Sequence, residues 1–116
     1  MLTDKRLLEF DAEALVAAVA ASPRAAERLG LLRQVPFGAC FHPDTQEVEF
    51  LYGHAQAPRR FRLKAGAVGA FLVSYCIRAR VPMPRGAEKS VQVEPNGVVL
   101  SLRTQVPRFI AVATEF

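Results

Sequence analysis

The segment from Glu47 to Lys64 constrains the fold more than any other part of this 116-residue chain. From Glu47, acidic residues alternate with apolar ones, and from Arg60 to Lys64, basic residues alternate with apolar ones. A short loop over residues 53–58 separates the two halves. Such alternation is typical of strands with one buried and one wet face. The segment therefore predicts a β-hairpin with one apolar and one charged face.

One register satisfies both faces of this predicted hairpin. It brings apolar residues together on one face and opposite charges together on the other, and each such pair contributes roughly 0.2–1 kcal/mol. A slip by one residue would destroy both patterns. The predicted pairs are Tyr52–Arg59, Phe50–Phe61, Val48–Leu63, Glu49–Arg62 and Glu47–Lys64.

Two helical regions are predicted from capping residues and from apolar spacing. Asp11 is a good N-cap, and Ser22-Pro23 ends one helix and can begin another, so we expect N-terminal helices over about 12–29. Apolar residues spaced by three and four predict a buried central helix over about 66–80. Its glycines, Gly66 and Gly69, are interpreted as close-packing positions.

Further strands are expected on both sides of the central helix. Alternation over 35–41 predicts a strand before the hairpin. After the helix, an Asn96-Gly97 turn would pair Val93 with Leu100 and Val91 with Leu102, and a Pro95-Asn96 turn is the alternative. A nearly continuous apolar run over 109–114 predicts a last strand.

Together these elements predict a single α+β domain over residues 1–116. We expect an antiparallel sheet of five to six strands with helices packed on one face. The predicted order is two helices, three strands, the central helix and three strands. The chain is long enough to bury a substantial core.

The charges of this chain are unevenly distributed. Residues 1–55 hold five Lys or Arg and eight Asp or Glu, whereas residues 56–116 hold ten and three. Such asymmetry can mark a surface for anionic partners. The candidate anion- or partner-binding residues are Arg59, Arg60, Arg78, Arg80, Arg85 and Lys89.

Local structure offers another explanation for part of this basic segment. The predicted register neutralises Arg62 and Lys64, and cations at 78 and 80 suit the end of a helix, where carbonyl groups lack partners. A solvated basic face is the alternative to anion binding. The charges then left without a structural explanation are Arg59, Arg60, Arg85 and Lys89.

The two cysteines and two histidines are candidates for a metal site or a nucleophile pair. Cys40 and His42 are weak metal candidates because they project from the same face of one strand. Their spacing to His54 and Cys76 matches no common zinc pattern, so buried thiols beside surface histidines are expected instead. No cofactor and no catalytic residue is expected.

The leading functional hypothesis is a non-enzymatic binding or adaptor module that self-associates, with a homodimer as the candidate assembly. The excess of Arg over Lys and the eighteen alanines suggest a bacterial source, and the lack of a long apolar run predicts a cytoplasmic protein without membrane contact. The expected partner is an acidic protein. The alternative is a nucleic-acid or phosphate-ligand binding accessory protein that uses the basic 59–89 segment, and an enzyme is the least favoured class.

Overall fold

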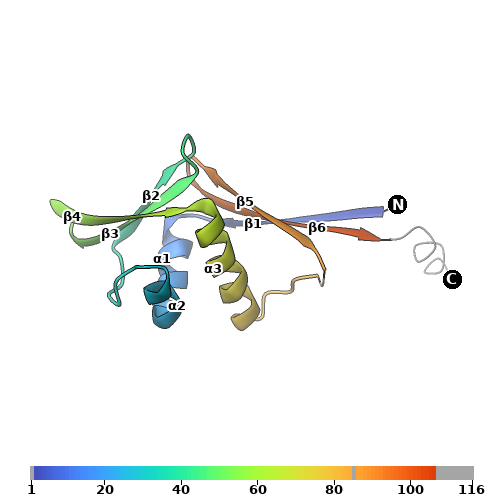
Figure 1. The fold of residues 1–116 in the computed structure, drawn as a ribbon, viewed down its shortest axis with the longest axis horizontal. Helices are drawn as coiled ribbons and strands as arrows, with labels where there is room; N and C mark the ends of the chain where they lie inside the picture. Colours follow the sequence, from blue (N-terminus) through green and yellow to red (C-terminus); the bar gives the residue numbers. More distant parts are fainter. Residues whose placement is uncertain (1, 85, 107–116) are drawn as a thin grey trace.

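The computed structural model describes residues 2–84 and 86–106 and has an α+β architecture, as the sequence predicts (Figure 1). The predicted strand over 109–114 lies outside these residues. In chain order the described elements are β1 (Leu2–Phe10), α1 (Ala12–Ala21), α2 (Pro23–Arg28), β2 (Gly38–His42), β3 (Glu47–His54), β4 (Ala57–Lys64), α3 (Ala65–Arg78), β5 (Glu88–Glu94) and β6 (Gly97–Val106).

The six described strands form two antiparallel sheets of three, in the orders β1-β6-β5 and β2-β3-β4. The prediction of one sheet of five to six strands is therefore wrong in its continuity. Figure 1 shows the two sheets sloping away from the line where β2 and β5 approach, with α1, α2 and α3 on the same side of both. One helical layer thus covers one face of each sheet, and the opposite faces carry no described helix.

The β3–β4 hairpin has the predicted register at all five pairs. The register predicted for β5–β6 is wrong by two residues, because Glu94 faces Gly97 and the turn consists of Pro95 and Asn96. Val93 consequently faces Val98 instead of Leu100. The turn weighed as the alternative is the one that forms.

The N-terminal region differs from the predicted order because a strand, β1, precedes the helices. Asp11 caps α1 as expected, since its carboxylate accepts a hydrogen bond from the Ala14 N–H at 2.8 Å. Residues 2–7 are exposed on both sides of β1, so they show no apolar alternation. A strand without a buried face carries little periodic signal, and this explains why the prediction missed it.

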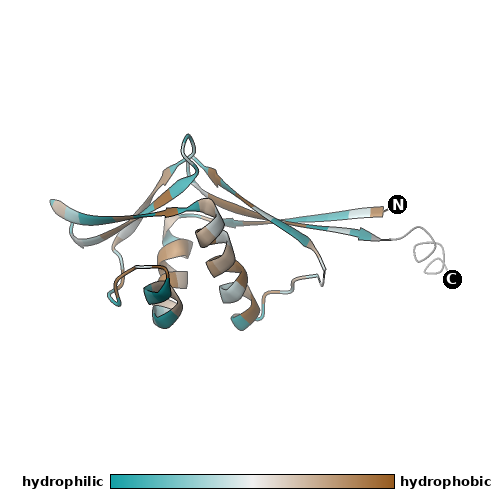
Figure 2. Cartoon of the chain, in the orientation of Figure 1, coloured by the Kyte–Doolittle hydropathy of each residue, from teal (hydrophilic) through white to brown (hydrophobic). Residues whose placement is uncertain are grey.

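A shared core lies between the helical layer and the two sheets. It includes Leu15 and Leu72 from the helices, Phe50 and Tyr52 from β3, and Val98 from β6, all at most 2% exposed. Figure 2 shows that α1 and α3 are largely hydrophobic. Full burial of a side chain of this size contributes about 1.5–3 kcal/mol. This core therefore holds the two sheets in one unit.

The central helix α3 begins one residue before the predicted start and ends earlier than predicted, at Arg78. The Arg80 N–H donates to the Ile77 carbonyl and the Val81 N–H donates to the Cys76 carbonyl, which is a Schellman ending. Arg80 therefore adopts φ +60°, a conformation that normally favours glycine. The prediction of a buried helix is wrong for one side, because Ile77 is 63% exposed.

The two sheets are linked by the side chain of Gln46, in the turn between β2 and β3. Its amide nitrogen donates to the Val93 carbonyl at 3.0 Å, and its amide oxygen accepts from the Val93 N–H at 2.8 Å. The Gln46 side chain thus acts as one additional peptide group at the edge of β5. No described strands pair between the two sheets, and this side chain supplies backbone-like hydrogen bonds between them instead.

Alanine substitutions at the two helix glycines should change stability in opposite directions. A Cβ atom at Gly69 would lie 2.8 Å from Val91 Cγ1, whereas a Cβ atom at Gly66 would meet nothing within 4 Å. We expect Gly69→Ala to lower the free energy of unfolding by about 1–3 kcal/mol. Gly66→Ala should raise it by about 0.4–1 kcal/mol, because the unfolded chain loses entropy.

Urea unfolding followed by circular dichroism measures both effects, and each variant serves as the other's control. A Gly69→Ala protein as stable as wild type would show that α3 does not pack closely on β5. In the structure, the space around each glycine confirms the close-packing interpretation for Gly69 and shows that it is wrong for Gly66.

Candidate functional site

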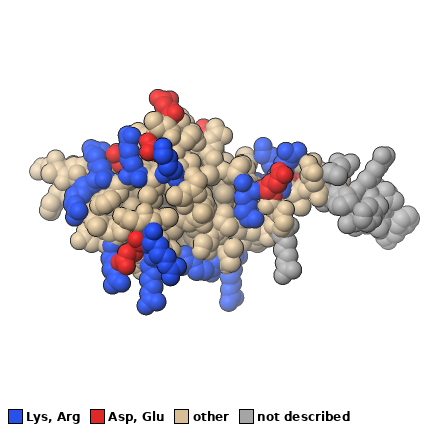
Figure 3. Space-filling model, in the orientation of Figure 1, with Lys and Arg blue, Asp and Glu red and all other residues tan. Residues whose placement is uncertain are grey.

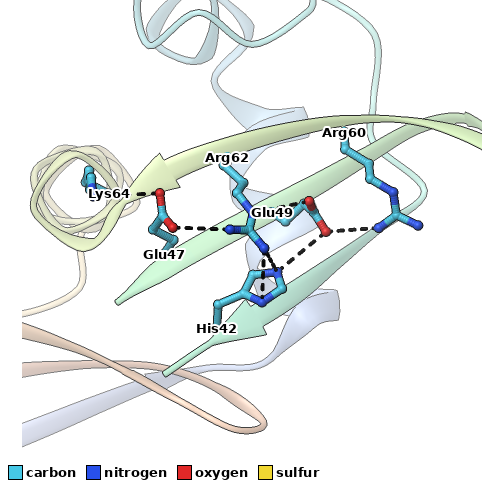
Figure 4. Close-up of polar contacts among 6 residues, drawn as sticks. All are labelled: His42, Glu47, Glu49, Arg60, Arg62 and Lys64. Carbon is cyan, nitrogen blue, oxygen red and sulfur yellow. Dashed lines mark hydrogen bonds and ion pairs between the residues drawn. The ribbon is translucent and has the colours of Figure 1, made fainter. Parts of the chain in front are cut away.

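The charged cluster of this protein lies on the outer face of the β2-β3-β4 sheet, opposite the helices (Figure 4). Strand alternation places its members on this face, because neighbouring positions along each strand point toward the core. The outer-face cluster consists of His42, Glu47, Glu49, Arg60, Arg62 and Lys64.

Glu49 is the centre of this cluster, and its side chain is only 9% exposed. One oxygen, Oε1, lies 2.9 Å from Arg60 Nη1 and 3.5 Å from His42 Nε2. The other oxygen, Oε2, lies 3.4 Å from Arg62 Nε. A carboxylate with little access to water is thus surrounded by two guanidinium groups and an imidazole.

The pKa of Glu49 reflects two opposing effects. Burial raises the pKa of its carboxyl, but hydrogen bonds from Arg60, His42 and Arg62 outweigh burial and leave the pKa below the ordinary value. The carboxylate therefore stays charged at neutral pH, and it orients the three side chains that surround it.

Glu47 extends the cluster toward the start of α3. Its Oε1 lies 3.3 Å from Arg62 Nη1, and its Oε2 lies 3.8 Å from Lys64 Nζ. The predicted pairs Glu47–Lys64 and Glu49–Arg62 are confirmed. Two acids and three cations therefore leave this face with only a small excess of positive charge.

Arg60 has a carboxylate partner, contrary to the prediction that it lacks a structural explanation. It faces Leu51 directly and reaches Glu49 along the diagonal of the antiparallel pair. Long side chains make such diagonal contacts readily. The prediction considered directly opposed residues alone, and this is why it missed the pair.

Arg59 lies on the other face of β4, toward the helices. Its guanidinium carbon is 5.6 Å from the centre of the Phe61 ring, a cation–π arrangement. Phe61 in turn packs edge-on against Tyr52, with ring centres 5.3 Å apart. Among the described residues, no carboxylate pairs with Arg59. Of the candidate cations in this hairpin, it is the one free to meet an anion.

The remaining candidate cations lie at separate places. Arg78 donates to the Ser22 hydroxyl at 2.8 Å and to the Ser74 carbonyl at 3.4 Å, so it supports the end of α3 as predicted. Arg80 is the left-handed residue that closes the same helix. Lys89 donates to the Ala87 carbonyl at 3.2 Å, and Arg85 lies outside the described residues.

The candidate cations are not gathered at one place. Arg59 and Arg60 lie on opposite faces of β4, Arg78 and Arg80 lie at the far end of α3, and Lys89 lies on β5. On the face drawn in Figure 3, basic side chains form several separate groups with acidic side chains beside them. The visible surface therefore shows mixed charge.

The cysteines and histidines occupy separate environments. Cys40 and His42 share the outer face of β2 as predicted, but the His42 ring is already in contact with Arg62 and Glu49. Cys76 is buried, and burial raises the pKa of its thiol, which disfavours the nucleophilic thiolate. The described residues contain no group of three His, Cys, Asp or Glu side chains suited to a metal ion.

An apolar hollow of about 430 Å³ lies between α3 and β5. Its walls come mostly from small and aliphatic residues, and Lys89 and Ser90 lie at its border. Such a lining can accept an apolar group but supplies little chemistry. The apolar lining residues include Gly66, Gly69, Ala70, Val73, Val91 and Leu100.

Comparison with family models, curated proteins and solved structures gave no match to this chain. Among the described helices, none is both long enough and apolar enough to span a membrane.

Glu49→Gln should destabilise the protein more than a matched change at an exposed pair. Hydrogen bonds to a charged group contribute about 1.5–3 kcal/mol, so we expect a loss of that order in the free energy of unfolding at neutral pH. Glu27 is 48% exposed and pairs with Arg33, which is 75% exposed, so Glu27→Gln should cost less than about 1 kcal/mol. Chemical denaturation of both variants measures the contrast.

The effect of Glu49→Gln should also depend on pH. Because the folded-state pKa of Glu49 is lowered from its ordinary value of 4.5, its contribution is fully present above that value and is lost as pH falls through the lowered pKa. The difference between wild type and Glu49→Gln should therefore shrink on acidification below pH 4.5. A difference that stays constant would contradict this account.

Proposed function

We propose that this protein is a non-enzymatic binding or adaptor module that self-associates. The observation that carries the proposal is the ribbon formed by the first half of β1 and the second half of β6. Figure 1 shows this ribbon extending beyond α3, and the molecule measures 61 × 28 × 19 Å. The ribbon stands clear of the helical layer that covers the rest of the sheet.

A projecting ribbon of this kind gains from an additional partner. Beyond the pair of Glu88 with Arg103, the described ribbon has two strands, residues 2–4 of β1 and 104–106 of β6. A two-stranded ribbon is marginally stable in water by itself, because it has no second layer against which to bury side chains. Leu2 is 58% exposed and Leu7 is 54% exposed, both on β1. Association would remove these apolar side chains from water and add a layer or a strand to the ribbon.

The described side chains favour binding over catalysis. The hollow beside α3 is apolar, and the buried Cys76 thiol has a raised pKa. A second hollow of about 420 Å³ lies at the tip of the β5–β6 hairpin and is bordered by Glu9, Asp11 and Glu94. Among the described residues, these carboxylates form no group of three suited to hold a metal ion. A binding role is consistent with such surfaces.

Self-association should be detectable in dilute solution. Sedimentation velocity over a range of protein concentrations should show a transition from a monomer of 12.7 kDa to a dimer. High salt should not abolish the dimer, because backbone pairing and apolar burial are weakly screened compared with exposed charges. A protein that remains monomeric at the highest attainable concentration would contradict the proposal.

The alternative function, binding of a nucleic acid or phosphate ligand, is supported by one specific observation. Arg59 has no described carboxylate partner and lies over the Phe61 ring, and the combination of cation and aromatic ring occurs at single-stranded nucleic-acid sites. Arg60 serves as a matched neighbour because Glu49 already neutralises it.

Oligonucleotide binding separates the two functions. If the alternative holds, affinity for a single-stranded oligonucleotide falls steeply with salt, and Arg59→Ala reduces the slope of that dependence by about 1. Arg60→Ala should change the slope less, because this side chain is held by Glu49. Fluorescence anisotropy measures both. Absence of binding at low salt would remove the alternative.

A further inference from the structure

One edge of β1 is unpaired along the described strand. A two-residue turn joins Glu94 to Gly97, and the pair that closes such a turn exchanges backbone hydrogen bonds. From Gly97 onward, every second residue of β6 therefore forms its backbone hydrogen bonds with β5. The residues between them, beginning with Val98, form theirs with β1. The β1 residues whose N–H and C=O groups then point away from β6 are Thr3, Lys5, Leu7 and Glu9.

The same alternation is verified at the opposite edge of this sheet. It places the N–H and C=O groups of Val93 outward from β5, where the Gln46 side chain bonds both of them at 2.8 and 3.0 Å. The assignment of outward groups on β1 therefore rests on a ladder whose phase is supported by a separate contact.

The other sheet edges are protected from pairing with another chain. On β5, the Gln46 side chain already bonds the outward N–H and C=O groups of Val93. Lys89 also lies outward on this edge, where a lysine discourages pairing with another strand. On β4 the outward residues begin with Pro58, which has no N–H group. They continue with three cations whose charge Glu47 and Glu49 balance only in part, so the small positive excess disfavours a second copy. β2 has five residues and approaches β5. β1 has nine residues, carries no proline, and its one outward lysine, Lys5, is matched by the outward acid Glu9.

We propose that a second copy of this chain adds to the open edge of β1, antiparallel and centred on Leu7. The β1-β6-β5 sheets of the two copies would then join into one continuous six-stranded sheet. Its strand order would be β5-β6-β1 of one copy followed by β1-β6-β5 of the partner. This inference rests on the proposed self-association and assigns its surface. Backbone pairing along β1 would supply the main contact, as in other cases of strand addition.

The side chains of β1 are complementary in this register. Leu7 meets the partner's Leu7, and Lys5 meets the partner's Glu9 at two symmetric positions, so apolar and charged residues are both matched. Leu7 is 54% exposed in the single chain. Pairing across the two-fold axis would bury this side chain against its own copy.

The partner's Glu9 would also relieve a repulsion within the chain. Lys5 lies directly opposite Arg103 on β6, and like charges at such positions are destabilising. Glu88 on β5 faces Arg103 from the other side. The row across the joined sheet would run Glu88, Arg103, Lys5 and the partner's Glu9, with two acids and two bases.

Neighbouring registers that also join outward backbone groups are poorer. Centring on Arg6 would set Lys5 against Leu7 and Thr3 against Glu9, without an opposite-charge pair. Centring on Lys5 would pair Asp4 with the partner's Arg6 but would also bring two lysines together on the axis. The register centred on Leu7 has opposite-charge pairs and no like-charge pair, so charge matching favours it.

Charge reversal tests the register in the full chain. Lys5→Glu alone sets two Glu–Glu pairs across the axis, and Glu9→Lys alone sets two Lys–Lys pairs. Each single variant should weaken dimerisation at least about tenfold. An equimolar mixture of the two variants should recover wild-type affinity, because every pair across the axis is then between opposite charges. Sedimentation velocity measures all three samples.

Two controls separate loss of the interface from loss of the fold. Leu7→Pro removes an N–H group that points away from β6 and leaves the hydrogen bonds between β1 and β6 in place. The variant should be folded by circular dichroism and monomeric by sedimentation velocity. Ile77→Ser removes an apolar side chain of similar exposure, 63%, on α3 and should leave the dimer unchanged.

The outcomes distinguish this inference from the proposed function. If wild type dimerises and the single variants dimerise equally well, or if the mixture does not recover affinity, the β1 register is overturned while self-association stands. If wild type does not associate at any concentration, both fail together. Recovery in the mixture alone would establish the pairing of Lys5 with the partner's Glu9.

Discussion

The contact between Gln46 and Val93 is the constraint on which the arrangement of the two sheets depends. Every polar group of Gln46 forms a hydrogen bond. Its side-chain amide bonds to the backbone of Val93 and to the Pro43 carbonyl. Its backbone N–H donates to the Pro43 carbonyl, and its backbone carbonyl accepts from the Ala65 N–H. The residue adopts φ +54° to make these bonds, which is uncommon without glycine. A single side chain thus ties the β2–β3 turn both to β5 and to the start of α3.

The fold could be predicted where side-chain periodicity and charge agree. The β3–β4 hairpin combines an apolar face with paired opposite charges, and only one register satisfies both, so all five predicted pairs were correct. The β5–β6 hairpin has no charge pattern near its turn, and the choice between the Asn96-Gly97 and Pro95-Asn96 turns determined the register alone. β1 was missed because most of its length has no buried face.

The outer-face cluster could be predicted in part for the same reason. Directly opposed pairs follow from the register, and the Glu49–Arg62 and Glu47–Lys64 contacts were expected. The Arg60–Glu49 contact depends on the length of the arginine side chain and the twist of the strands, which the residue pattern does not contain. The contact of Arg78 with Ser22 joins residues 56 positions apart and depends on how α3 packs beside α2.

The uneven charge of the chain acquires a structural meaning from the strand edges. The cations of β4 alternate with inward residues, so Arg60, Arg62 and Lys64 stand along an unpaired edge. Glu47 and Glu49 balance them only in part, and the small positive excess disfavours pairing of two copies there. On β1 both signs are present, and the outward positions carry one base and one acid on either side of Leu7. In the proposed dimer, the positive excess along β4 and the matched charges along β1 would direct association to β1. In the proposed dimer, the basic half of the sequence would help to determine where the two copies meet.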